Sequence, residues 1–464
     1  MKRCEKIGGQ AKPPVPRWAK CPGCTVGQAV WPAARSSEAV SHLLRIAALA
    51  LWAGLGLAAG AEDTLLLRGG TVHPVSGPDI AGGAVLVRDG KIAEVGAKIA
   101  APRGARVIEL KGLHLYPGLI DSATEIGLSE IGAVRETNDV NEIGDFNPQL
   151  RALIAVNPAS EHIPVTRANG ITSVITAPGG GIICGQAALL HLDGWTWQEM
   201  GLVPSVAMVI EFPVIQSGRG RFGGETPGRG TPFAEARRTY ERRLRELDEF
   251  FERARRYQKA KAAGPVEKDL KMEAMLPVLE KKLPVVIVAQ RERAIREALK
   301  WAEKQQIRMI LAQADEAWKV AADLKAKNVP VILGPTLRLP LHEDDPYDKP
   351  VTQPAELFKA GVKFAFGSFS TSFSRNLPYQ AANAVAFGLP QEEGLKAITL
   401  NAAEIWGVAD RLGSIEPGKL ADLIVTDGDP LETRTQIKQM FIQGRPVDLD
   451  NKHLRLYKKY LERQ

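Results

Sequence analysis

Asp121 and Glu125 are two carboxylates four residues apart in the segment that follows Pro117. A pair of carboxyl groups can divide the roles of general acid and general base between them, as hydrolases that use no metal ion do. We therefore treat Asp121 and Glu125 as candidate catalytic residues. Their spacing in the sequence does not give the distance between the two side chains.

A glycine-rich segment, Pro178–Gln186, is the second candidate for chemistry. Successive backbone N–H groups in such a loop can wrap a ligand, which makes Gly179, Gly180, Gly181 and Gln186 candidate binding residues. An ordinary flexible loop between a strand and a helix is the alternative. Within this segment Cys184 has no histidine close by in the sequence, so a buried, inert thiol is favoured over a nucleophile.

The histidines beyond residue 61 do not form a motif with metal-ligand spacing. They are His73, His114, His162, His191, His342 and His453. Only His162 and His191 fall among the early loops of the long middle segment, where a ligand could have relocated. The acidic loop HEDDPYD, which begins at His342, does not match the spacing of an EF-hand, so a solvated loop is favoured over a calcium site.

Charge patterning argues against a nucleic-acid partner. The 464-residue chain has a formal net charge of +7, but its acidic and basic residues are interspersed. The most basic run, Arg237–Lys271, alternates in sign and carries apolar residues at near-helical spacing, which predicts a solvated amphipathic helix with one stripe packed inward. No concentrated basic face for nucleic acid is expected.

Residues 1–61 differ from the rest and predict an N-terminal extension with a signal peptide. The apolar stretch Leu43–Ala61 ends in small residues and is typical of a secretory signal cleaved after Ala61, so we expect export to the periplasm. It is short and rich in Gly and Ala, so no stable membrane span is expected after cleavage, a retained anchor being the alternative. The pair Cys21 and Cys24 lacks two further ligands nearby, which argues against a metal site.

Short alternating stretches punctuated by Gly and Pro predict small antiparallel strands near both ends of the remaining chain. We expect residues 62–115 and 409–450 to build one small β-sandwich domain together, followed by a C-terminal tail at 451–464. Asp89–Gly90 predicts a two-residue hairpin turn, because both residues tolerate positive φ.

The middle segment, residues 116–408, alternates apolar strand-like runs with amphipathic helices. Helices are expected at Glu292–Lys304, Glu316–Lys325 and Leu377–Phe387, each after an apolar run. Strand and helix in alternation predict parallel βα units, and the length of the segment favours an α/β fold of the eight-stranded (β/α)8 TIM-barrel type.

Several stretches resemble the amidohydrolase superfamily, in particular its imidazolonepropionase-like metal-dependent hydrolases. They include LLLRGGTVHPVSG, LYPGLIDSATEIG, VKFAFGSFSTSF and GSIEPGKLADLIVTDGDPL. The resemblance implies a barrel flanked by a composite β sandwich. It also implies hydrolysis of non-peptide carbon–nitrogen bonds by a water that one or two divalent cations activate at the barrel mouth.

The same resemblance implies which positions hold the metal ligands, and this chain departs from the family at nearly all of them. The positions are Ala123, Glu125, Val288, Gln313 and Phe369, where the family carries four histidines and an aspartate. Alanine, valine and phenylalanine offer no lone pair, and one carboxylate with one amide cannot build a catalytic zinc site. We therefore expect no cofactor.

The substitutions favour a pseudoenzyme over a working metallohydrolase. In this reading the protein binds a small-molecule ligand or a related amidohydrolase subunit, as a homo- or hetero-oligomer. The alternative is an active hydrolase that uses Asp121 and Glu125, or relocated ligands around one divalent cation such as zinc.

Overall fold

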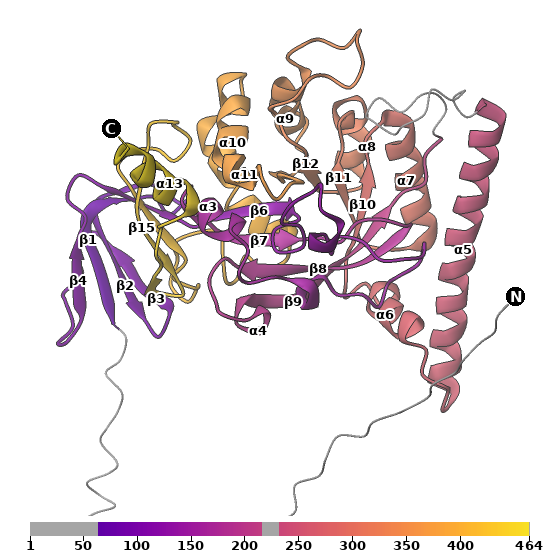
Figure 1. Ribbon diagram of the computed structural model, residues 1–464, viewed down its shortest axis with the longest axis horizontal. Helices are drawn as coiled ribbons and strands as arrows, with labels where there is room; N and C mark the ends of the chain where they lie inside the picture. Colours follow the sequence, from indigo (N-terminus) through magenta and orange to yellow (C-terminus); the bar gives the residue numbers. More distant parts are fainter. Residues whose placement is uncertain (1–63, 216–231, 464) are drawn as a thin grey trace, which may run out of the picture. The chain divides into compact units, whose positions relative to one another are not determined.

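Two eight-stranded sheets organise the computed structural model, which describes residues 64–215 and 232–463 (Figure 1). The predicted signal peptide and the pair Cys21 and Cys24 lie outside the described residues. The described residues belong to one compact unit. The first sheet is a nearly closed barrel, and strands from both ends of the described chain build the second.

The barrel sheet runs in the order β13-β12-β11-β10-β9-β8-β7-β6. The Phe369 N–H, just beyond the last strand, donates to the Ala123 carbonyl in the first strand at 2.7 Å and so draws the two edges together. The strands are β6 (Leu119–Thr124), β7 (Ile171–Thr176), β8 (Ile183–His191), β9 (Gly201–Glu211), β10 (Val285–Ala289), β11 (Met309–Gln313), β12 (Val331–Leu333) and β13 (Phe364–Phe366).

One strand breaks the expected regular repeat. β8 pairs antiparallel with both β7 and β9, whereas the other neighbours in the barrel sheet pair in parallel. A parallel neighbour needs a crossover of about a dozen residues or more. The segment between β7 and β8, residues 177–182, is too short for one. The expectation of eight parallel βα units is therefore wrong at β7–β9, and an α/β barrel remains.

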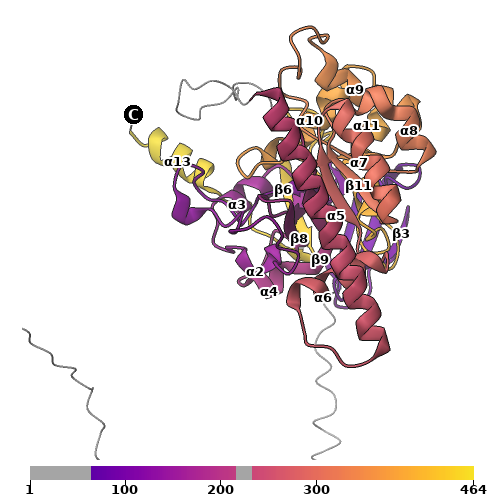
Figure 2. The ribbon, with the colours of Figure 1, turned by 90° about the vertical axis from the view of Figure 1, so that its right-hand side faces the viewer.

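Helices cover the outside of the barrel, and α5 runs alongside α7 in both views (Figures 1 and 2). α5 (Phe233–Ala263) buries a stripe that includes Tyr240, Leu247 and Phe250, which confirms the predicted amphipathic helix. It ends at Ala263, short of Lys271. Among the described helices, none is both long and apolar enough to cross a bilayer.

The three other predicted helices, Glu292–Lys304, Glu316–Lys325 and Leu377–Phe387, are present with small shifts at their ends. The helix expected at Glu316–Lys325 begins with a 3-10 turn at Ala317–Val320 and continues as α8. The bounds are α2 (Ala152–Ala155), α3 (His162–Arg167), α4 (Trp197–Met200), α6 (Leu270–Leu279), α7 (Glu292–Gln305), α8 (Ala321–Ala326), α9 (Lys349–Lys359), α10 (Leu377–Ala386), α11 (Gln391–Ala397), α12 (Leu400–Ile405) and α13 (Lys452–Leu461).

The second sheet joins the two ends of the described chain. β14 pairs antiparallel with β5, and the order is β16-β15-β14-β5-β1-β2-β3, with β4 paired to β1. The predicted hairpin turn is confirmed, with φ of 50° at Asp89 and 76° at Gly90. The strands are β1 (Leu65–Val72), β2 (Ile80–Arg88), β3 (Lys91–Gly96), β4 (Arg106–Glu109), β5 (His114–Pro117), β14 (Leu423–Thr426), β15 (Ile437–Ile442) and β16 (Arg445–Pro446).

Candidate functional site

A cavity of about 120 Å³ lies at the carboxyl ends of the barrel strands. The five positions that the resemblance assigns to metal ligands all line it, although they come from four different strand ends. They are Ala123, Glu125, Val288, Gln313 and Phe369. The five positions therefore lie together and line one cavity.

The chemistry of the lining is mostly apolar, with two carboxylates. Glu125 and Glu211 are the charged residues among the described residues that line the cavity, and none of these is His, Lys or Arg. Burial raises the pKa of Glu125 above its ordinary value. Glu211 accepts a hydrogen bond at its Oε1 from the Gly180 N–H, at 3.0 Å. The site thus places two acceptor groups in an apolar wall.

Two of the five positions have an unusual backbone. Gln313 and Phe369 have φ of 64° and 47°, in the left-handed region that side chains other than glycine rarely adopt. Ala314, beside Gln313, has φ of 51°. Such conformations persist only where the surroundings enforce them, and they gather at functional sites. The rim of the cavity is therefore held in a defined shape at these strand ends.

Asp121 takes a different place from Glu125. Its carboxylate is fully buried and accepts hydrogen bonds from the Ser368 N–H at 2.9 Å, the Ala123 N–H at 3.2 Å and the Ser374 hydroxyl at 2.6 Å. Burial raises its pKa to about 6, although these hydrogen bonds oppose the rise. Asp121 is not among the described residues that line the cavity. The two predicted carboxylates therefore do not both face it, and Glu125 does.

The glycine-rich loop contributes to the cavity in part. Gly179 lines it, whereas Gln186 lies in β8 and donates from its Nε2 to the Pro148 carbonyl at 2.8 Å. Gly180 and Gly181 have φ of 79° and 78°, which glycine tolerates best. Cys184 is buried and its pKa is raised to about 12, chiefly by burial, in keeping with the predicted inert thiol.

The two histidines considered as relocated ligands have other roles. His162 Nε2 lies 3.0 Å from the Glu130 carbonyl oxygen, which fixes a loop next to α3. His191, at the end of β8, is buried with its Nε2 2.8 Å from a carboxylate oxygen of Asp422. Neither is among the described residues that line the cavity.

A second group of donors corrects the expectation of no cofactor. Glu316, His342 and Asp345 each offer a ligand atom, and these atoms lie within 4.8 Å of one another. One imidazole nitrogen and two carboxylate oxygens suit a divalent cation with water completing its shell. The expectation was wrong because it looked for ligands only at the five family positions and at His162 and His191, and it took the loop that begins at His342 for an ordinary solvated loop.

The surroundings of Glu316 bear on how such a cation would be held. Glu316 Oε1 lies 2.6 Å from Lys319 Nζ and 3.1 Å from His342 Nε2, and its Oε2 accepts from the Glu292 N–H at 2.6 Å. Burial acts to raise the pKa of Glu316, but the hydrogen bonds from Lys319 and the Glu292 N–H lower it overall. The carboxylate stays ionised, and a cation would compete with the Lys319 ammonium for it.

Sequence reasoning missed Glu211 and Trp406, which also line the cavity. Glu211 ends β9 directly after the buried run Val206–Ile210. A charged residue that closes an apolar strand of a barrel is a signal that could have found it. Trp406 follows α12 and carries no comparable signal.

Comparisons with known proteins agree with this architecture. Residues 292–448 match a family model described as the amidohydrolase family. The amidohydrolase tasK of Hapsidospora irregularis is 24% identical over 420 residues, which cover 81% of this chain and 41% of that protein. An imidazolonepropionase of Porphyromonas gingivalis is 40% identical over 74 residues, which cover 15% of this chain and 18% of that enzyme.

A solved structure matches over a larger share of its length. The amidohydrolase of Thermotoga maritima MSB8 is 29% identical with a TM-score of 0.71, and the match covers 83% of this chain and 99% of that one. The chain spans less than half the length of either curated relative named above. Family model, relatives and structure agree, and the chain carries a domain of the amidohydrolase family.

Proposed function

We propose that the barrel cavity binds a small nitrogen-bearing molecule, and that metal-dependent hydrolysis does not take place in this cavity. One observation supports the proposal: Ala123, Val288 and Phe369, which the sequence resemblance assigns to metal-ligand positions, line a single cavity. Their hydrocarbon side chains cannot bind a cation. A cation would instead be held outside the lining, at Glu316, His342 and Asp345.

The two carboxylates define the chemistry of the proposed guest. Glu125 and Glu211 lie in a mostly apolar wall, and no basic residue is among the described residues that line it. Partial burial of a carboxylate without a cation carries a cost, and it raises the pKa of the half-buried Glu125, whereas Glu211 is exposed. A ligand with an ammonium group, an amidinium group or several N–H groups compensates the cost of desolvating the carboxylate. The rings of Trp406 and Phe369 add surfaces that attract a cation.

Binding of benzylamine and benzamidine to the full chain, followed by ligand-observed NMR, tests this proposal, with benzyl alcohol as the neutral comparator. We expect both cations to bind about tenfold more tightly than the alcohol, or ~1.4 kcal/mol. Glu125→Gln and Glu211→Gln should each remove that preference. Glu142→Gln, at an exposed glutamate that does not line the cavity, is the matched control. Equal binding of all three probes would contradict the proposal.

A second candidate function is hydrolysis without metal, with Glu125 and Glu211 as acid and base. The observation in its favour is that both carboxylates line one cavity while burial raises the pKa of Glu125. General acid–base catalysis can divide its two roles between two such carboxyl groups. Hydantoin and dihydrouracil are suitable test substrates. If turnover persists when metal ions are chelated and is lost in Glu125→Gln, this candidate is favoured. If turnover is lost on chelation, is restored by zinc and is absent in His342→Ala, a relocated metal ion is favoured.

A further inference from the structure

Helix α13 (Lys452–Leu461) has an apolar side that the rest of the described chain does not cover. Asn451 begins the helix, because its side chain accepts from the His453 N–H at 3.0 Å and the Leu454 N–H at 3.2 Å. None of the residues from 452 to 463 is buried. Five large apolar side chains are exposed there: Leu454 at 43%, Leu456 at 37%, Tyr457 at 63%, Tyr460 at 52% and Leu461 at 48%.

The spacing of these residues places them on one side of the helix. Leu454, Tyr457 and Leu461 are three and four residues apart, and Leu456 and Tyr460 are four apart. At 3.6 residues per turn the two sets are adjacent. The opposite side carries the basic residues Lys452, Arg455, Lys458, Lys459 and Arg463. The helix is therefore strongly amphipathic.

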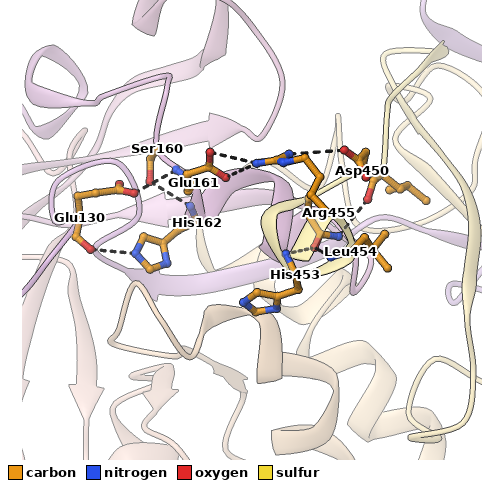
Figure 3. Close-up of polar contacts among 10 residues, drawn as sticks. Glu130, Ser160, Glu161, His162, Asp450, His453, Leu454 and Arg455 are labelled. Atoms are coloured by element: carbon orange, nitrogen blue, oxygen red, sulfur yellow. Dashed lines mark hydrogen bonds and ion pairs between the residues drawn. The ribbon is translucent and has the colours of Figure 1, made fainter. Parts of the chain in front are cut away.

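The polar side, and not the apolar one, holds the helix to the rest of the protein. Arg455 Nη2 donates to both carboxylate oxygens of Glu161, at 2.9 and 3.1 Å, and its Nη1 lies 3.5 Å from Asp450 (Figure 3). Lys458 Nζ lies 3.9 Å from the same aspartate. Amphipathic helices of globular proteins usually bury the apolar stripe. Here ion pairs anchor the basic side and leave the apolar stripe open to solvent.

We propose that α13 is a membrane-surface anchor whose apolar side enters the interface of an anionic phospholipid bilayer. Residues 452–463 contain five basic side chains and one acidic one, Glu462, which gives a net charge of +4 with His453 neutral. Basic residues beside an apolar stripe with tyrosines are the pattern of helices that lie on a membrane. Lysine and arginine stems can extend to the headgroups while leucine and tyrosine enter below them.

Charge and area argue against a second copy of the chain as the occupant of this side. Two such helices, each with more basic than acidic side chains even after the pairing of Arg455 and Lys458 with Glu161 and Asp450, would repel when placed against one another. A ten-residue helix is about 15 Å long, and one side of it covers far less than the ~800 Å² per partner of a stable interface. Neither objection applies to an anionic bilayer, because its charge is opposite to that of the helix and its surface is much larger than the helix.

Sedimentation with lipid vesicles tests the proposal on the full chain. One set of vesicles contains phosphatidylcholine alone, and the other contains phosphatidylcholine with phosphatidylglycerol. We expect binding to the anionic set that weakens as salt rises. Leu454→Glu with Tyr457→Glu should lower this binding at least about tenfold, because it places charge in the apolar stripe. Lys452→Glu with Lys459→Glu should lower it while leaving that stripe intact.

Ile143→Glu with Leu339→Glu is the matched control, because both side chains are apolar, highly exposed and outside α13. This control should bind anionic vesicles as the unchanged chain does, with equal thermal unfolding in all variants. Unchanged vesicle binding in both α13 variants would overturn the proposal, and so would equal binding to the two vesicle types. Sedimentation velocity can give a further result against the proposal. If the unchanged chain is an oligomer that does not bind vesicles, and if Leu454→Glu with Tyr457→Glu dissociates this oligomer, α13 serves self-association instead.

Discussion

The Asp121 carboxylate accepts a hydrogen bond from the backbone N–H of Ser368, at 2.9 Å, across the seam between the first and last barrel strands. The Ser374 hydroxyl donates to the other oxygen at 2.6 Å. The Asp121 side chain therefore helps to close the barrel between β6 and β13, where backbone hydrogen bonds alone leave the closure incomplete. The same carboxylate is fully buried, so its protonation is coupled to the stability of the fold.

Asp121 should make the protein less stable as pH rises from about 4 to about 6. Its pKa in the folded state is about 6, above the ordinary value of 3.8, so in this window the folded protein binds more protons than the unfolded chain. The contribution of Asp121 to the free energy of unfolding is therefore complete at low pH and is lost as pH rises through 6. Asp121→Asn removes this dependence, and its stability relative to the unchanged protein should rise by ~3 kcal/mol across the window.

Urea unfolding at several pH values measures this effect. Asp344→Asn, at an exposed aspartate, is the control and should leave the pH profile of the unchanged protein intact. Parallel profiles for Asp121→Asn and the unchanged protein would show that the buried carboxylate does not titrate as described.

Restoring the family ligands should create a metal site in the barrel cavity. The change combines Ala123→His, Glu125→His, Val288→His, Gln313→His and Phe369→Asp, all at positions that line the cavity. Four imidazoles and a carboxylate around one space can hold at least one divalent cation. Elemental analysis after dialysis should find about one more equivalent of zinc than in the unchanged protein. His342→Ala is added both to this variant and to the unchanged protein, so that the group of Glu316, His342 and Asp345 does not contribute to the difference in zinc content. A folded variant without additional metal would count against the assignment of these positions.

Zinc should bind the unchanged protein at Glu316, His342 and Asp345, where three ligand atoms lie within 4.8 Å of one another. Titration calorimetry should show His342→Ala lowering the affinity at least about tenfold, or ~1.4 kcal/mol. His453→Ala, in the exposed helix α13, is the control. Lys319→Met should raise the affinity, because the ammonium at 2.6 Å competes for the Glu316 oxygen. Zinc binding that neither His342→Ala nor Lys319→Met alters would place the ion elsewhere.

Gly181→Ala should destabilise the loop beside the cavity. The residue has φ of +78°, and a Cβ there would meet the Gly144 carbonyl oxygen at 2.8 Å. The left-handed backbone alone costs about 1–2 kcal/mol for alanine. Gly82→Ala is the matched control, since φ is +62° but nothing lies within 4 Å of the added Cβ. Thermal unfolding should show the larger loss for Gly181→Ala, and equal losses would mean that the steric contact is relieved.

Strand and helix patterns predicted much of the fold, because hydrophobic periodicity reports which side of an element is buried. The run before Glu292 became β10 and the segment after it became α7, as expected. The strand β8 and its direction were both missed, since Ile183–Gln186 had been assigned to the glycine-rich loop and the apolar residues of β8 are compatible with a parallel or an antiparallel neighbour. Only the short connection at 177–182 distinguishes the two, and the glycines there had been assigned to a ligand loop.

The candidate site was predictable where it follows linear motifs. Ala123 and Phe369 lie next to recognisable strand ends, and the structure brings them into one cavity. The group of Glu316, His342 and Asp345 was not predictable, because His342 lies in a long loop whose path depends on tertiary packing. The left-handed backbone at Gln313 and Phe369 is likewise invisible in the sequence, since neither residue type favours it.

The pairing of β5 with β14 has a consequence for how the protein is made. Leu423 pairs with Pro117, so the sheet that joins the chain ends lacks a strand until translation has passed the whole barrel. Contacts of such high sequence separation slow folding and leave strand edges exposed in partly made chains. Loss of the segment from β14 onward would therefore deprive β5 of one of its two neighbours, leaving β1 alone paired with it, and would leave an open edge prone to aggregation.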